Sequence, residues 1–244
     1  MENYKNLIIE ALKDQQEIFG DNLFQKIDID FNSIQENILV KEQTVKYMKK
    51  NIKPNDFSNI VTLDDFHSRI DQCQKCNLGK TRTNFVFGSG NPNADVMIIG
   101  EAPGAEEDKK GLPFVGRAGK LLTDILKAIN FERDEVYIAN ILKCRPPNNR
   151  NPLPAEMDEC MPFLYKQIDI IKPKAILMLG LVAATGLLKQ KTSLTKLRGN
   201  VFEINGVKSM VTYHPAALLR NPNWKRSCWE DVQKFKKLYD DLNK

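Results

Sequence analysis

The sequence predicts an α/β fold built around a central parallel sheet of four strands with helices on both faces. Two observations predict it: short β-branched apolar runs recur along the chain, and stretches with helical spacing separate them. Such alternation is typical of βαβ units, in which parallel strands are covered by helices on both sides. With 244 residues, 42% of them hydrophobic, the chain is long enough for one such domain and an extension.

Each predicted element has its own signal. Apolar runs of strand length predict strands at 95–99, 136–142, 175–179 and 208–213. Apolar residues three and four positions apart predict helices at about 64–72, 117–130, 154–171, 181–189 and 223–242. No run approaches the length of a membrane span and no signal-peptide stretch follows the N-terminus, so we expect a cytoplasmic protein.

The first 56 residues are expected to form a separate unit. Helical spacing at 4–19 and a Lys-rich stretch at 34–52 predict a helical N-terminal extension, in which we find no catalytic motif. Residues 1–56 carry 8 Lys against 10 Asp and Glu, whereas residues 140–226 carry 14 Lys and Arg against 5 acidic residues. We therefore expect a main domain at 57–244 whose basic part binds a polyanion, most simply nucleic acid.

The five cysteines indicate a metal site rather than disulfides. An odd number in a chain without an export signal argues against a disulfide framework. Cys73 and Cys76 form a compact C-x-x-C pair, and Cys144 and Cys160 form a second pair. Four thiolates suit either Zn²⁺ or an iron–sulfur cluster, and the spacing alone leaves both open. Cys228 is expected to be a small buried side chain on the last helix.

Three polar side chains directly follow or end apolar strands. They are Glu101, Asn140 and His214. Ligands of parallel sheets bind just beyond the carboxyl ends of the strands, so we expect these side chains to line one pocket. The amide of Asn140 offers both a donor and an acceptor, which suits the edge of a nucleobase. Phe114, within Gly111–Gly116, is a candidate stacking platform.

Several motifs together resemble the iron–sulfur, thermostable-type uracil-DNA glycosylases known as family 4. The resemblance spans roughly residues 60–240 and depends on four stretches: Gly100–Gly104, Gly111–Gly119, Ala139–Asn140 with Lys143–Pro147, and His214–Pro215 with Leu218–Pro222. It implies a uracil-DNA glycosylase-like three-layer sandwich. It also implies a monofunctional enzyme that flips uracil out of DNA and hydrolyses the N-glycosidic bond, thereby initiating base excision repair.

The resemblance also implies roles for individual residues. A [4Fe–4S] cluster would be held by the thiolates of Cys73, Cys76, Cys144 and Cys160. Uracil would contact the turn formed by Gly100, Glu101, Ala102, Pro103 and Gly104. Phe114 would stack on the ring, Asn140 would pair with O4 and N3–H, and His214 would donate to O2. The group that enters the duplex would be Leu218 or Leu219, together with Arg220.

The resemblance leaves the water-activating group open. The best-known uracil glycosylases carry an Asp where this chain has Ala102. Glu101, Glu107 or Asp108 could act instead, or the enzyme could depend mainly on stabilising the leaving uracil. Glu107 could alternatively crowd the 5-position of the base to exclude thymine.

Two other classes of protein compete with this interpretation. A related branch binds uracil-DNA and traps it covalently through an extra histidine, but residues 189–200 contain none. A redox protein would use the cluster itself as its active centre. For the favoured enzyme we expect a monomer that acts on single- or double-stranded DNA containing uracil.

Overall fold

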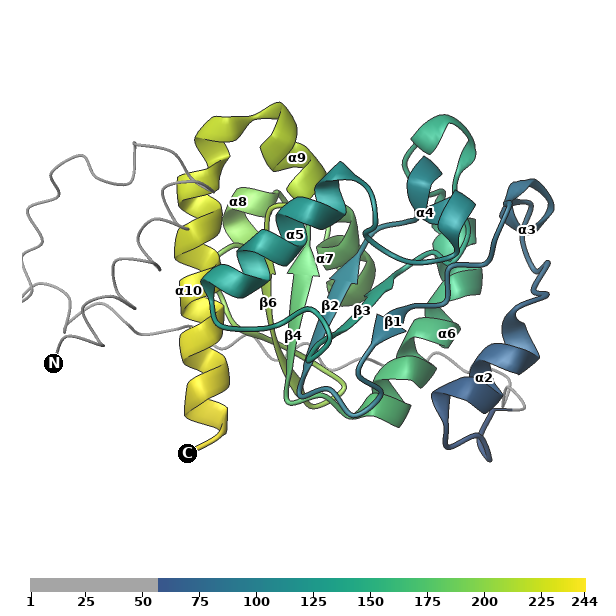
Figure 1. Cartoon of the computed structure of the whole chain (residues 1–244), viewed down its shortest axis with the longest axis horizontal. Coiled ribbons are helices and arrows are strands. Elements are labelled where there is room, and N and C mark those ends of the chain that lie inside the picture. The colour runs from purple at the N-terminus through teal and green to yellow at the C-terminus, as the bar shows by residue number, and fades with distance from the viewer. Residues whose placement is uncertain (1–56) are drawn as a thin grey trace, which may run out of the picture.

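A mixed six-stranded sheet forms the centre of the protein, which a computed structural model describes for residues 57–244 (Figure 1). The predicted N-terminal extension lies outside these residues. The order across the sheet is β1-β3-β2-β4-β6-β5. The strands are β1 (Ser89–Gly90), β2 (Val96–Gly100), β3 (Tyr137–Asn140), β4 (Ala175–Leu179), β5 (Phe202–Ile204) and β6 (Val207–Thr212).

The prediction of a four-stranded sheet is correct for its centre and incomplete at its edges. The four middle strands are parallel, whereas β1 and β5 are added antiparallel at the two edges. β1 has only two residues, too few to give a periodic signal. β5 and β6 form a hairpin whose turn residues, Asn205 and Gly206, both have positive φ (50° and 83°). Asn-Gly is a strong signal for such a turn, so the hairpin could have been recognised from the sequence.

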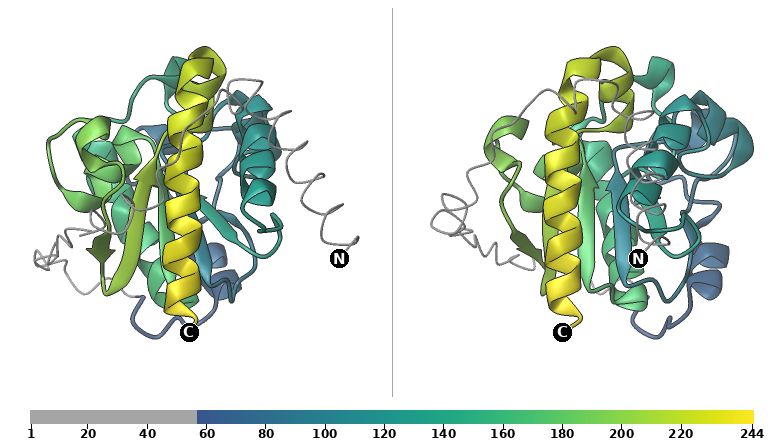
Figure 2. Two further views of the ribbon diagram at one scale, coloured as in Figure 1. Left: turned by 90° about the vertical axis from the view of Figure 1, so that its left-hand side faces the viewer. Right: turned by 60° about the vertical axis from the view of Figure 1, so that its left-hand side comes forward.

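Helices cover both faces of the sheet. They are α2 (Leu63–Ile70), α3 (Leu78–Thr81), α4 (Ala105–Lys110), α5 (Arg117–Ala128), α6 (Pro154–Ile171), α7 (Leu181–Leu188), α8 (Leu194–Leu197), α9 (Pro215–Arg220) and α10 (Lys225–Leu242), with 3₁₀ turns η2 (Pro147–Asn149) and η3 (Pro222–Trp224). Figure 2 shows α5 and α7 on opposite sides of the sheet. None of these described helices is long and apolar enough to cross a membrane.

Two hydrophobic cores result, one on each face of the sheet. Along β2, Val96 and Ile98 pack with residues of α5 and α10. Met97 and Ile99 point to the other face and pack with residues of α2, α6 and α7. All five residues of β2 are buried, which explains why this strand is a continuous apolar run rather than an alternating one.

Candidate active site

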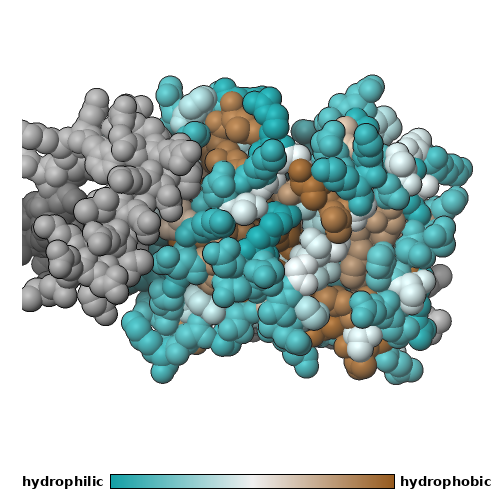
Figure 3. All heavy atoms as spheres, viewed as in Figure 1, coloured by the Kyte–Doolittle hydropathy of each residue, from teal (hydrophilic) through white to brown (hydrophobic). Residues whose placement is uncertain are grey.

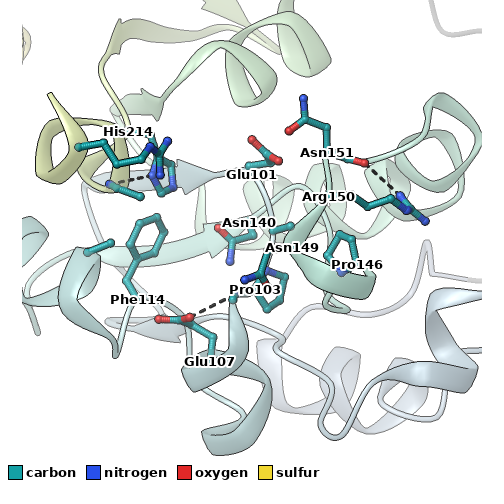
Figure 4. Close-up of a pocket in the computed structure, with 15 residues that line it drawn as sticks. Glu101, Pro103, Glu107, Phe114, Asn140, Pro146, Asn149, Arg150, Asn151 and His214 are labelled. Carbon is teal, nitrogen blue, oxygen red and sulfur yellow. Dashed lines mark hydrogen bonds between the residues drawn. The ribbon is translucent and has the colours of Figure 1, made fainter.

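A cavity of about 340 Å³ lies beyond the carboxyl ends of the parallel strands (Figure 4). Gly100, the last residue of β2, pairs in register with Asn140, the last residue of β3. Glu101 follows directly, and His214 lies two residues beyond the end of β6. The expected convergence is therefore observed: Glu101, Asn140, His214 and Phe114 all line this cavity, as do Ala102, Pro103 and Gly104.

Asn140 has a buried side-chain oxygen that lacks a partner. The residue is 2% exposed, and no described residue bonds to its Oδ1. Its backbone carbonyl accepts a 2.9 Å hydrogen bond from Nζ of Lys143, which is itself fully buried and donates to Oε1 of Gln167 at 2.6 Å. An unpaired buried acceptor is unfavourable by about 1–3 kcal/mol. The backbone of Asn140 is therefore held in place by Lys143, and its side-chain oxygen can accept a hydrogen bond from a ligand.

Gly100 supports the cavity without lining it. A Cβ atom at this position would overlap Oδ1 of Asn140 and the ring of Phe114. Gly100 is not among the residues that line the cavity, so its contact with the substrate stays a prediction. Its lack of a side chain leaves room for the two groups that do line the cavity. Its carbonyl accepts from the backbone N–H of Ile141 at 3.0 Å, which continues the pairing of β2 with the chain after β3.

Phe114 is held in an unusual backbone conformation. Its φ is 51°, a left-handed value that is uncommon for a bulky residue. Gly119, in the first turn of α5, makes this possible because a Cβ there would overlap the Phe114 carbonyl. The Phe114 ring is 6% exposed, and its centroid lies 5.4 Å from that of His214, with the rings inclined by 30°. Such backbone strain is typical of functional positions.

The environment of His214 keeps its imidazole neutral. Burial is the main cause that lowers its pKa from 6.5 to about 4, and the charge of Arg220 lowers it further, whereas Glu107 acts in the opposite direction. Nδ1 accepts a 3.1 Å hydrogen bond from the backbone N–H of Ala216, which can only donate. Neutral His214 therefore carries its proton on Nε2, and the ring is a hydrogen-bond donor on that side.

Of the three carboxylates considered for water activation, Glu101 and Glu107 line the cavity. Burial alone raises the pKa of Glu101. Asp108 does not line the cavity: its Oδ1 accepts from the backbone N–H groups of Thr83 and Asn84 at 2.9 and 3.3 Å. The interpretation of Asp108 as a water-activating group is therefore corrected, because its bonds tie α4 to the segment before β1.

The Glu107 carboxylate is occupied by the backbone of two loops. Its oxygens accept from the N–H groups of Gly104 at 3.1 Å and of Val115 and Gly116 at 2.9 Å each. We refer to this set of bonds as the Glu107 clamp. It joins the turn after β2 to the loop that carries Phe114. It also occupies the N–H of Gly104, a residue of the turn that is expected to contact uracil.

The two leucines of α9 have different environments. Leu218 is fully buried in the core on the α5 side of the sheet, so it is not available to enter DNA. Leu219 is 38% exposed and Arg220 lines the cavity. Only the second of the two leucines considered from the sequence is therefore at the surface.

The four cysteines of the expected metal site approach the same core without forming a closed site. Among residues 57–244, no three His, Cys, Asp or Glu side chains are close enough together to hold a metal ion. Cys144 and Cys160 are buried, and Cys73 and Cys76 pack against the same hydrophobic cluster. Cys228 is fully buried in the other core, as expected.

Burial dominates and raises the pKa of Cys144 and Cys160, and the hydrogen-bond donors around these two thiols act in the opposite direction. Nη1 of Arg82 lies 3.3 Å from Sγ of Cys144 and also bonds to the Cys73 carbonyl at 2.5 Å. The backbone N–H of Lys143 lies 3.3 Å from Sγ of Cys160. Burial raises the pKa of both thiols, whereas these nearby donors and the positive charges of Arg82 and Lys143 lower it. The donor set thus fits a thiolate-bound metal group.

One wall of the cavity was not identified from the sequence. It is formed by Pro146, Asn149, Arg150 and Asn151, in the polar loop around η2. Arg150 is held by Glu156 through contacts of 2.6 and 2.9 Å. The sequence does contain a signal for this wall. Pro146 belongs to one of the motifs of the resemblance, and the residues after it are polar and follow a predicted strand. Asn149 and its neighbour Asn148 both have a φ of 54°.

Comparisons with known proteins identify the family. The family model described as the uracil DNA glycosylase superfamily matches residues 87–242. The type-4 uracil-DNA glycosylase of Archaeoglobus fulgidus is 44% identical over 185 residues, which cover 72% of this chain and 93% of the relative. Those of Sulfurisphaera tokodaii and Thermotoga maritima are each 46% identical, covering 72% and 69% of this chain and 84% and 90% of the relatives. The chain therefore belongs to the uracil-DNA glycosylase superfamily, as a member of its type-4 family.

Proposed function

We propose that this protein removes uracil from DNA by hydrolysing its N-glycosidic bond. The observation that carries the proposal is the buried, unpartnered Oδ1 of Asn140 in a cavity beside an aromatic ring and a neutral histidine donor. A base inside a duplex has to be flipped out to reach such a cavity.

Asn140 distinguishes uracil from cytosine. Its Oδ1 accepts from uracil N3–H and its amide NH₂ donates to O4. Cytosine presents an acceptor at N3 and a donor at the 4-position, so both contacts are mismatched. Each mispaired buried group is unfavourable by about 1–3 kcal/mol, and together the two mismatches reduce cytosine binding by a factor on the order of 10² or more.

His214 and Phe114 act on the leaving base. Phe114 stacks on the flipped ring, with His214 at its edge. As the glycosidic bond breaks, negative charge develops on uracil O2. The Nε2–H of His214 donates to that oxygen, and the bond strengthens as the charge grows. A neutral donor suits this role because it remains protonated at Nε2 over the physiological pH range.

We assign the water to Glu101. Its carboxylate lines the cavity, and burial raises its pKa, which makes it a stronger base than an exposed Glu. The Glu101 carboxylate would orient the attacking water towards C1′ of the deoxyribose and accept a proton from that water. The hydroxyl of the water bonds to C1′ as the bond from C1′ to uracil breaks, and uracil leaves as its anion, which takes up a proton from solvent. No covalent bond to the enzyme is formed.

The opening in the duplex is filled from α9. Leu219 is exposed and would take the space that the flipped base leaves, and Arg220 contacts the neighbouring phosphate. Phosphate contacts of this kind supply most of the affinity for DNA and make it sensitive to salt. We expect the protein to act as a cytoplasmic monomer on single- or double-stranded substrates.

We also propose that Cys73, Cys76, Cys144 and Cys160 hold a [4Fe–4S] cluster. The support is the set of four thiols near one core, with Arg82 and the Lys143 backbone N–H donating to two of the sulfurs. When bound, such a cluster supplies a cross-link between distant segments and a redox centre. In this chain it would fix the residues that follow Asn140, and no step of base removal passes through it.

A single-stranded oligonucleotide with one uracil tests the proposed reaction. Incubation followed by alkali should cut the strand at the uracil position, and matched oligonucleotides with cytosine or thymine should remain intact. Asn140→Asp should lose most of the uracil activity. An intact uracil strand, or a protein–DNA adduct that persists in a denaturing gel, would contradict the proposal, and the adduct would indicate a trapping protein.

A further inference from the structure

An exposed tryptophan follows α9, the helix whose last residue, Arg220, lines the cavity. Trp224 ends η3, four residues after Arg220, and is 41% exposed. Leu219, in α9, is 38% exposed. Figure 3 shows a mostly hydrophilic face with hydrophobic side chains gathered in a few patches, one of them at the end where α9 lies.

The indole of Trp224 is held in place by a stack of side chains. Its ring lies 5.1 Å from the ring of Tyr213, and the two planes are inclined by only 20°. The guanidinium of Arg198 lies 4.4 Å from the Tyr213 centroid. Arg198 is fixed in turn by bonds of 2.6 and 3.1 Å to Asp231 and of 2.6 Å to the carbonyl of Ser227.

This stack connects the exposed ring to buried structure. Asp231 is 3% exposed and also accepts from Thr212, the last residue of β6, at 2.8 Å. Tyr213 is the residue before His214. The exposed indole is therefore held in one position relative to the cavity. Because the Trp224 side chain has already lost its freedom, stacking of a base on it costs little further conformational entropy.

The charge around Trp224 favours a nucleic-acid partner. Arg220 precedes it, and Lys225 and Arg226 follow it directly. Arg226 lies 3.6 Å from Glu230, in a pair whose two side chains are both more than half exposed, so solvent screens this pairing. An aromatic ring between cations is typical of surfaces that bind unpaired strands, because bases stack on the ring while phosphates contact the cations.

We propose that Trp224 is a stacking platform for an unpaired nucleobase next to the flipped one. The inference extends the proposed function, since it places a second base of the same strand outside the cavity. Stacking of one base on an aromatic side chain contributes about 1–3 kcal/mol, which corresponds to a factor of roughly 5–150 in affinity. Trp224 should therefore favour single-stranded or locally opened DNA over an intact duplex.

The test uses the full chain and single-stranded DNA without uracil, so that binding is measured apart from base removal. Trp224→Ala should weaken binding by a factor of roughly 5–150. Trp224→Phe, which keeps an aromatic ring, should stay within about threefold of the unsubstituted protein. Leu242→Ala is the matched control, because Leu242 is also 40% exposed but lies at the far end of α10.

Fluorescence gives a second readout that is specific to stacking. The chain has two tryptophans, and Trp229 is only 8% exposed. DNA should quench the emission of the unsubstituted protein, and Trp224→Phe should lose this quenching while it still binds. Normal DNA binding by Trp224→Ala, quenching that persists in Trp224→Phe, or an oligomer that Trp224→Ala dissociates would each overturn the proposal. If the unsubstituted protein binds single-stranded DNA but has no uracil activity, and Trp224→Ala loses that binding, only the proposed function is overturned.

Discussion

His214 provides the most direct test of the proposed chemistry. Replacing it with Ala removes the only donor that we place at uracil O2. Loss of one donor to a developing oxyanion usually slows the chemical step by about 10²–10³, or roughly 3–4 kcal/mol. We therefore expect His214→Ala to reduce the single-turnover rate by that factor. Affinity for uracil-DNA should change far less, since phosphate contacts dominate binding.

The structure also determines the pH dependence of this residue. With a pKa of about 4 instead of 6.5, the imidazole is disfavoured as a cation by about 3 kcal/mol. At pH 5.5 only about 3% of His214 would be protonated, against about 90% for an unperturbed histidine. The pKa is lowered on folding, so the related stability is complete above pH 6.5 and declines as the pH falls toward 4.

Nuclear magnetic resonance can distinguish a His214 imidazole that stays neutral from one that titrates near pH 6.5. The chain has only two histidines, so a His67→Gln variant labelled with ¹⁵N leaves His214 as the single imidazole. Its signals should remain those of the neutral Nε2–H form down to about pH 5. Titration near pH 6.5, a proton on Nδ1, or an unchanged single-turnover rate in His214→Ala would refute the reasoning. An intact chemical rate with much weaker binding would assign His214 to DNA docking.

Three further predictions concern the water, the metal and α9. Glu101→Gln should slow turnover and remove the acid limb of the rate profile, which in the unsubstituted protein should lie above the usual Glu pKa; an identical profile would exclude Glu101 as the base. The purified protein should absorb visible light and contain about four irons, with iron lost in Cys73→Ala and kept in Cys228→Ala; a colourless protein with one zinc would replace the cluster by a zinc site. Leu218→Ala should lower the free energy of unfolding by about 2–5 kcal/mol, whereas Leu219→Ala should leave stability unchanged and slow base removal from duplexes more than from single strands; equal effects on both substrates would argue against insertion.

The sequence predicts most accurately those elements whose local pattern of apolar residues is compatible with a single secondary structure. β4 and α6 were predicted with the observed bounds, because an unbroken apolar run and a helical repeat beginning at Pro154 each specify one structure. The convergence of Glu101, Asn140 and His214 followed from topology alone, since the ends of parallel strands meet at one edge.

Features that depend on tertiary contacts could not be predicted in the same way. Nothing in Leu218-Leu219 indicates which leucine is buried, because that depends on how α9 packs against the core. The role of Asp108 likewise depends on the backbone of Thr83 and Asn84, which is distant in sequence. The positive φ of Phe114 becomes understandable only when Gly119 is seen beneath its carbonyl.

The Glu107 clamp has a consequence for the size of base that the protein admits. A single carboxylate fastens both loops that border the space above Asn140, so the width of that space is set before any DNA arrives. A purine, larger by one ring, would have to push these loops apart and break charge-assisted bonds worth about 1.5–3 kcal/mol each. The clamp thus fixes the width of this space in the protein without DNA, which disfavours purines, while Asn140 distinguishes uracil from cytosine.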